Sequence, residues 1–242
     1  MTRALWLADA LRAEGVTVVE EPGWRDRGNP TFSPKGVICH HTAGPARGDA
    51  PSLGTCINGR PGLPGPLCQI VLARSGTAHV IASGRANHAG AGGWRGLTGN
   101  TSVFGIEAEN TGLGEPWPQV QYDAYVRVVA ALCRRGGIPT GMVCAHREWA
   151  PTRKIDPRGI DMTDFRHHVA DRLGPIAPPP VTPPEGFLMA LTEAEQREIL
   201  AKVRSTDLRV QELDQQLTDG ANAKKGGISR RILDALARLE AR

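Results

Sequence analysis

A proline-rich run divides this sequence into two parts of different character. Residues 175–184 read Pro-Ile-Ala-Pro-Pro-Pro-Val-Thr-Pro-Pro, and five of these prolines fall within 178–184. Proline fixes φ and has no backbone N–H to donate, so a run of this density favours an extended, semi-rigid spacer. We therefore predict a folded domain over residues 1–174, a proline-rich linker over 175–187 and a separate tail over 188–242.

The composition of the chain is that of a globular protein with many loops. Hydrophobic residues make up 40% of its 242 residues, and it contains 29 glycines and 19 prolines. No stretch approaches the roughly 20 apolar residues of a membrane-spanning helix. Asp9 and Arg12 interrupt the N-terminal segment before any long apolar core forms, so we expect no signal peptide and synthesis in the cytoplasm.

Charge and cysteine content argue against a nucleic-acid partner and against a disulfide scaffold. The net charge of the chain is +4, which is too weak to indicate nucleic acid. Five cysteines, an odd number without tight pair spacing, do not match a disulfide framework. Cys56 and Cys68 can pair across a loop rich in glycine and proline, but we favour free thiols.

Before the proline-rich run, short apolar strands alternate with amphipathic helices. The segments 69–72 and 77–81 flank Arg74-Ser-Gly76, which predicts a hairpin. Strands interleaved with helices predict an α/β fold in which helices flank a mixed central β-sheet. The expected helices cover residues 4–13 and 162–173, with a third whose apolar stripe covers 122–133 and which ends near Gly136-Gly137. The other expected strands cover residues 37–40, 104–109 and 142–145.

Beyond the linker, the sequence predicts a short helical tail. Apolar residues follow the capping box Thr192-Glu-Ala-Glu195 at helical spacing until Gly226-Gly227, after which a second helical pattern begins. Residues 178–220 hold eight acidic and four basic residues, whereas residues 221–242 hold two acidic and six basic residues. Opposite charges, and a length that is marginal for independent folding, favour docking or self-association as a homo-oligomer.

The segment 146–157 contains an imidazole, an ammonium and a carboxylate within a short stretch of the chain. It reads His-Arg-Glu-Trp-Ala-Pro-Thr-Arg-Lys-Ile-Asp-Pro, and a second source of imidazole lies far upstream at His40 and His41. Two histidines and one carboxylate from separate segments complete three corners of a tetrahedral zinc site and leave the fourth for water, as in catalytic sites. We favour His40 over His41 as the upstream ligand, because His41 would point to the opposite face of its strand.

Lys154 and two glutamates add further chemical groups. An ammonium beside a dication is unfavourable unless it stabilises negative charge that develops during a reaction. Lys154, two residues before Asp156, fits such a role, and a solvated loop lysine is the alternative. Glu107 and Glu109 project from the same face of an expected strand.

These motifs resemble those of the zinc-dependent N-acetylmuramoyl-L-alanine amidases, which include phage endolysins and the catalytic peptidoglycan recognition proteins. The resemblance extends over roughly residues 1–173. The ending Arg-Lys-x-Asp-Pro is similar to the branch of the family that uses Asp rather than Cys as the third ligand. The matching motifs are His40-His-Thr-Ala-Gly44, Asn87-His-Ala-Gly90, Gly105-Ile-Glu-Ala-Glu-Asn110 and the segment from His146 to Pro157.

The resemblance implies a zinc ion and several site residues. Lys154 would stabilise an oxyanion, and Glu107 takes the family's position for a proton shuttle, with Glu109 as the alternative. Beside these, His88 would polarise the substrate or orient a ligand, with a supporting or surface role as the alternative. Trp94 would form a platform for sugar or peptide, with a loop-packing role as the alternative. The implied zinc ligands are His40, His146 and Asp156.

The implied activity is hydrolysis of the amide that joins the lactyl group of N-acetylmuramic acid to L-alanine in bacterial peptidoglycan. Without a signal peptide, such an enzyme would be a phage endolysin, made in the host cytoplasm and released to the wall through a holin. A noncatalytic peptidoglycan-binding module and a cytoplasmic amidase that recycles soluble muropeptides are the alternatives. The tail would then self-associate or bind wall polymer.

Overall fold

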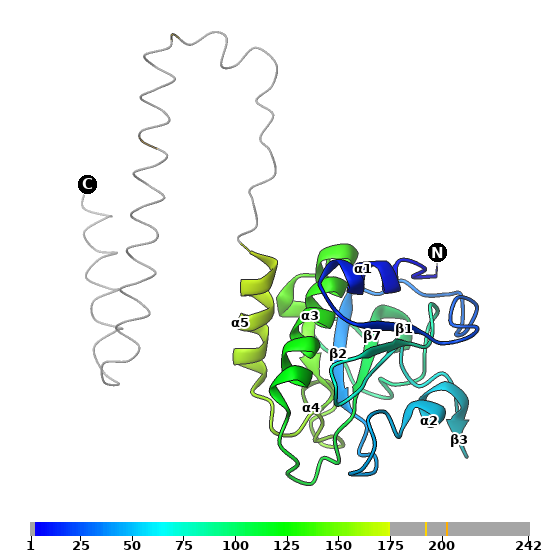
Figure 1. Cartoon of the computed structure of the whole chain (residues 1–242). Helices are drawn as coiled ribbons and strands as arrows, with labels where there is room; N and C mark the ends of the chain where they lie inside the picture. The colour runs from blue at the N-terminus through cyan, green and yellow to red at the C-terminus, as the bar shows by residue number, and fades with distance from the viewer. Residues whose placement is uncertain (1–2, 175–191, 193–201, 203–242) are drawn as a thin grey trace. The chain divides into compact units, whose positions relative to one another are not determined.

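A mixed β-sheet that includes β1, β2 and β7 lies at the centre of the described residues (Figure 1). It has six strands in the order β1-β6-β5-β7-β2-β8. The computed structural model describes residues 3–174 together with Thr192 and Lys202. The expected linker and tail, apart from those two residues, lie outside the described residues. The strands are β1 (Val18–Glu20), β2 (Gly36–His41), β5 (Ile70–Leu72), β6 (Ala78–Val80), β7 (Val103–Ala108) and β8 (Val143–Ala145).

The strand directions bring the site residues to one edge of the sheet. β5 and β6 pair antiparallel, as predicted for the hairpin, and the other neighbouring strands pair parallel. Because β2, β7 and β8 are parallel, their C-terminal ends meet at the same edge, where active sites of such sheets usually lie. The prediction of an α/β fold with a mixed sheet flanked by helices is confirmed.

Helices α1, α3 and α5 pack with the sheet around the larger apolar core. α5 has the expected bounds, and α3 ends where expected, before Gly137, which is left-handed with φ 62°. α1 begins later than expected, at Leu7, and α3 begins earlier, directly after Pro118. Within the described residues, no helix is both long and apolar enough to cross a bilayer. The helices are α1 (Leu7–Ala13), α2 (Leu53–Asn58), α3 (Gln119–Gly136), α4 (His146–Trp149) and α5 (Met162–Leu173), with short 3-10 turns at Asn100–Ser102 and Thr140–Met142.

Glu14, at the end of α1, ties the three larger helices together. Its carboxylate pairs with Arg134 of α3 over 2.6 Å and with Arg172 of α5 over 3.2 Å. Glu14 is buried, so this ion pair is shielded from solvent more than an ordinary surface pair. The contact fixes the C-terminal end of α5 against the rest of the domain.

The alternation of side chains along β2 and β7 separates core residues from site residues. Cys39 of β2 and Ile106 of β7 belong to the larger core, whereas Ile38 belongs to a smaller cluster on the other face. His40 and Glu107 therefore project on the face opposite the larger core. The two strands also pair these residues directly in register.

Several short elements were not expected from the sequence. They are β1, the helices α2 and α4, and a separate two-stranded sheet of β3 (Gly59–Arg60) and β4 (Leu63–Pro64). Each has only two to six residues, which is too short for a periodic pattern to be recognised. α2 and the small sheet contribute residues to the wall of the pocket described below.

Candidate metal centre and active site

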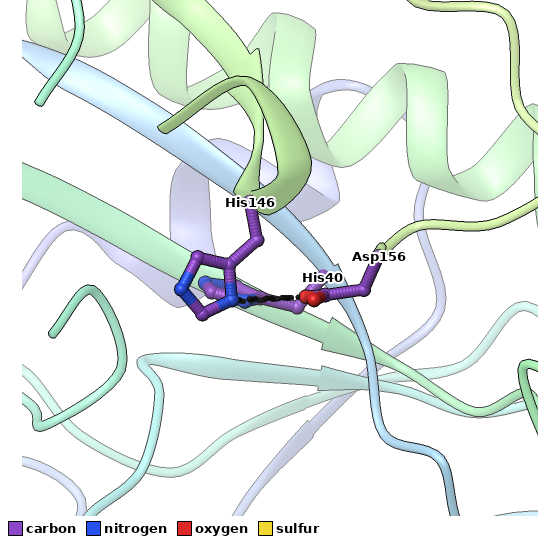
Figure 2. A group of neighbouring side chains, drawn as sticks. All are labelled: His40, His146 and Asp156. Atoms are coloured by element: carbon purple, nitrogen blue, oxygen red, sulfur yellow. Dashed lines mark hydrogen bonds and ion pairs between the residues drawn. The ribbon is translucent and has the colours of Figure 1, made fainter. Parts of the chain in front are cut away.

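Two histidines and one aspartate meet at the C-terminal end of β2, with their side chains pointing toward one another (Figure 2). His40 belongs to β2, His146 is the first residue of α4, and Asp156 lies in the loop after α4. The Nδ1 atoms of the two imidazoles are 2.9 Å apart, and each lies 3.0 Å from Oδ2 of Asp156. All three residues are buried. The structure thus brings together the three residues that the sequence predicted as ligands.

Contacts from α3 and from the start of α4 hold the two histidines. The buried hydroxyl of Tyr125 donates a hydrogen bond of 3.0 Å to the carbonyl oxygen of His40. The carboxylate of Glu148 accepts a hydrogen bond of 2.8 Å from the N–H of Ala145. Because Ala145 ends β8, this second contact fixes the junction at which His146 begins the helix.

The loop that carries Asp156 is held by two backbone contacts. The N–H of Arg147 donates a hydrogen bond of 2.9 Å to the carbonyl oxygen of Asp156. The N–H of Arg158 donates to Nδ1 of His41 over 3.1 Å. His41 therefore supports this loop, while His40 faces the other two candidate ligands.

The three side chains fit a divalent cation such as zinc. Nε2 of His146 lies 3.1 Å from the carbonyl oxygen of Ala89, which can only accept, so this nitrogen carries a hydrogen. The other nitrogen, Nδ1, faces the carboxylate of Asp156. Burial lowers the pKa of His40 to about 4, so this imidazole is neutral at pH 7. Imidazole nitrogens and carboxylate oxygens are ligands that zinc prefers.

A pocket of about 820 Å³ opens beside the three candidate ligands. Its wall includes residues from α2 and the small two-stranded sheet on one side, and from the loop after α4 on the other. This volume is ample for a small peptide or sugar fragment. The predicted site residues that line it are His88, Glu107, His146, Lys154 and Asp156.

Glu107 and Glu109 differ in what their carboxylates contact. Oε1 of Glu107 lies 3.9 Å from Nδ1 of His40, and its buried Oε2 has no hydrogen-bond partner among the described residues. Burial raises the pKa of Glu107 well above its usual value. Glu109 instead accepts hydrogen bonds from the N–H and hydroxyl of Ser52, at 2.6 and 3.0 Å, and from the hydroxyl of Thr42 at 2.8 Å. Of these two glutamates, Glu107 is therefore the one whose carboxylate combines a place in the pocket with free acceptor capacity.

Lys154 presents a cation to the same pocket. Its backbone N–H donates to the carbonyl oxygen of Ala150 over 3.0 Å, which fixes the backbone at this point. The described residues include no hydrogen-bond or ion-pair partner for its ammonium group. The ammonium is therefore available to a negatively charged group that enters the pocket.

His88 contacts a candidate ligand directly. Its Nδ1 lies 3.1 Å from Nε2 of His40, and its own Nε2 lies 3.3 Å from the carbonyl oxygen of Val103. Burial lowers the pKa of His88 well below its usual value, so the ring is neutral at pH 7. Of the two roles expected for His88, this geometry supports the orientation of a ligand.

Trp94 is not among the residues that line this pocket, and its contacts support the packing role that the sequence left open rather than a sugar or peptide platform. Its indole N–H donates to the carbonyl oxygen of Gly141 over 3.0 Å. The ring packs against the smaller apolar cluster that contains Ile38 and Trp149. Trp94 is therefore a packing residue of the loop that follows His88.

Asn100 is a site residue that the sequence analysis missed. Its side-chain oxygen accepts hydrogen bonds from the N–H groups of His88 and Ala89, at 2.9 and 2.8 Å. An asparagine after glycine is a common turn signal, but such a signal does not reveal a partner twelve residues away. Among the cysteines, Cys56 and Cys68 are free, buried thiols of one apolar cluster.

Comparisons with known proteins match the same part of the chain. The sequence profile of the N-acetylmuramoyl-L-alanine amidase family (Amidase_2) matches residues 29–159. The selenomethionine derivative of AmpD is similar in structure, with a TM-score of 0.52 and 23% identity over 70% of this chain and 99% of that chain. The catalytic domain of XlyA has a TM-score of 0.50 and 19% identity over 64% of this chain and 100% of its own. No protein with a curated description matches the chain.

The family match covers more than half of the chain and includes every residue of the candidate metal centre. It runs from the segment before β2 to the loop after Asp156, so it also includes Glu107 and Lys154. The two solved structures share the mixed sheet with its flanking helices. The chain belongs to the N-acetylmuramoyl-L-alanine amidase family and is an amidase of peptidoglycan.

Proposed function

We propose that the enzyme uses zinc to hydrolyse the amide bond between N-acetylmuramic acid and L-alanine. The observation that carries this proposal is the convergence of three ligand atoms, one each from His40, His146 and Asp156, beside a pocket that also holds Glu107 and Lys154. A zinc ion bound by the three ligands would lower the pKa of water and polarise a carbonyl group.

Glu107 and Lys154 would carry out the proton transfer and charge stabilisation. In the reaction, the oxygen of water bonds to the amide carbon and the carbon–nitrogen bond breaks. Glu107 takes a proton from the attacking water and delivers it to the departing amine of L-alanine. The ammonium of Lys154 stabilises the negative charge that develops on the carbonyl oxygen.

Metal analysis combined with mass spectrometry of digested cell wall tests this activity. The purified full-length protein is expected to hold one zinc ion and to release stem peptides with a free L-alanine amine from isolated sacculi. A zinc-loaded protein that binds sacculi but releases no peptide would contradict the proposal and support a noncatalytic binding module.

We further propose that the enzyme is a phage endolysin that acts on the polymeric cell wall. The proline-rich linker and the charged tail in the sequence support an extended wall target more than a soluble muropeptide. The turnover of sacculi is therefore expected to exceed the turnover of soluble muropeptides at equal concentrations of stem peptide. The opposite preference would support a recycling amidase.

Release through a holin is part of the same proposal. Production of the protein in bacterial cytoplasm is expected to lyse cells only when a holin-type pore is produced with it. Lysis without any pore, at the same level of protein, would show another export route.

For the tail, we propose self-association. Light scattering of the full chain and of a chain without residues 185–242 should then give different numbers of subunits. Equal values, together with weaker wall binding by the shortened chain, would instead indicate a wall-binding tail.

A further inference from the structure

We propose that His88 is a positioning residue, which sets the imidazole of His40 in the tautomer that binds a metal through Nδ1. This inference rests on the zinc site of the proposed function. His88 lies in the loop between β6 and β7 and is buried, and both of its ring nitrogens have partners within the protein. It therefore acts through His40 rather than on the substrate.

The carbonyl oxygen of Val103 determines which ring nitrogens of His88 and His40 carry a hydrogen. The oxygen of Val103 can only accept, so Nε2 of His88 carries the hydrogen that spans their 3.3 Å contact. In the neutral ring, Nδ1 of His88 is then an acceptor. Nε2 of His40, 3.1 Å away, must donate to it. Neutral His40 consequently has its lone pair on Nδ1, the atom that faces His146 and Asp156.

Strand β7 contains a gap that accommodates the ring of His88. A Cβ atom at Gly105 would lie 2.6 Å from Cγ and 2.7 Å from Nδ1 of His88, closer than Cβ atoms approach other groups. Gly105 is not in the left-handed region of φ, so its backbone does not require glycine. The absence of a side chain at Gly105 therefore serves the placement of this imidazole.

The dipeptide His88-Ala89 orients both candidate imidazole ligands. Asn100 accepts hydrogen bonds from the N–H groups of His88 and Ala89, which fixes this dipeptide. The ring of His88 then meets His40, while the carbonyl oxygen of Ala89 meets Nε2 of His146 over 3.1 Å. Histidines that bind metals generally donate their second N–H to such a partner, and loss of the partner weakens metal binding about 10- to 100-fold.

Substitution of His88 in the full-length protein tests the proposal through zinc affinity. His88→Leu removes the acceptor and is expected to raise the zinc dissociation constant about 10- to 100-fold in chelator competition. His88→Asn restores an acceptor oxygen near the position of Nδ1, so it should recover most of that affinity. His168→Leu is the matched control, because it removes an exposed imidazole of α5 that hydrogen-bonds to Tyr122. Equal zinc affinity of His88→Leu and the wild type would overturn the proposal.

Gly105→Ala provides a second test that keeps the imidazole but displaces it. This variant is expected to weaken zinc binding when His88 is present and to have no further effect in the His88→Ala background, where no ring is left to collide with the new methyl group. Gly54→Ala, in open space on α2, is the control for a glycine substitution. The same loss in both backgrounds would show that Gly105 acts independently of His88.

Two further measurements separate this inference from the proposed function. In the metal-free protein, ¹⁵N NMR should show the hydrogen of His40 on Nε2, and a hydrogen on Nδ1 would contradict the inference even if the enzyme is active. At saturating zinc, His88→Leu should keep the wild-type KM, whereas a raised KM would mean that His88 contacts the substrate. A wild-type protein that binds no zinc would instead overturn the proposed function.

Discussion

Two glutamates, two positions apart in the chain, have carboxylates with different surroundings. Glu109 accepts three hydrogen bonds that hold Ser52 and Thr42 in place, whereas Oε2 of Glu107 has no partner among the described residues. A carboxylate with free acceptor capacity can exchange a proton without disrupting its neighbours. The environment, more than the residue type, therefore distinguishes a reactive glutamate from a structural one.

Glu107→Gln is expected to lower kcat about 100- to 10,000-fold, because the amide cannot take the proton of water. Zinc content should not change, since Glu107 is outside the group of three ligands. Release of stem peptide from sacculi and metal analysis of the same sample measure both quantities. Comparable loss of activity in a stably folded Glu109→Gln protein would assign the proton transfer to Glu109 instead.

Lys154→Ala is expected to keep its zinc and lose about 2.7–4 kcal/mol of transition-state stabilisation. The reason is that the ammonium has no partner in the described structure and so serves a group that enters the pocket. The ratio kcat/KM, measured with a soluble muramoyl peptide, reports this loss directly. Full turnover by the variant would remove Lys154 from the mechanism.

The arrangement of the elements depends on a few buried polar contacts between helices and loops. Glu14 joins three helices. Arg74, in the hairpin turn, donates hydrogen bonds to the carboxylate of Glu115 and to the carbonyl oxygen of Gly48. Removal of one partner from such a contact is costly where the other partner is shielded from solvent, because the remaining charge is left without compensation. These contacts are therefore the positions at which a single substitution should loosen a whole element.

Glu14→Gln is expected to destabilise the domain by about 1–3 kcal/mol, because a buried carboxylate that pairs with Arg134 and Arg172 is lost. Denaturant unfolding measures the change in the free energy of unfolding. Asp9→Asn is the control, since its contact with Arg12 is exposed and should be worth less than about 1 kcal/mol. Equal effects of the two substitutions would show that Glu14 does not clamp the helices.

The pair of Arg74 and Glu115 should make stability depend on pH. The hydrogen bond from Arg74 lowers the pKa of Glu115 from its usual value of 4.5. A lowered folded pKa means that the pair stabilises the fold fully above about pH 4.5 and that this contribution is lost as the pH falls through the folded value. Unfolding of Glu115→Gln and wild type at several pH values should therefore give a difference that shrinks in acid. A difference that grows in acid would contradict this assignment.

For the molecule as a whole, zinc should be a stabilising ligand of the folded state. Binding only to the folded chain adds about 2.7 kcal/mol when free zinc is 100 times the dissociation constant. Thermal unfolding of the metal-free protein at increasing zinc concentrations should show a rising Tm. In His146→Ala the Tm is expected not to respond, and an unchanged response in that variant would place the metal elsewhere.

Long periodic segments and strand ends could be predicted from the sequence, whereas short elements and remote contacts could not. α3 and α5 were recognised because their apolar stripes run over several turns. The convergence of His40 with His146 was predicted because both follow apolar strands. The hydrogen bonds from Ser52 to Glu109 span 57 residues and leave no local pattern, so the structural role of Glu109 was not foreseen.

The separation of the ligands along the chain has a consequence for synthesis on the ribosome. His40 and Asp156 are 116 residues apart, and the strand that precedes His146 pairs with β2 only after most of the domain has been made. A nascent chain can therefore not assemble the centre until its loop beyond α4 has emerged. Only chains whose domain is complete can therefore form the site that hydrolyses peptidoglycan.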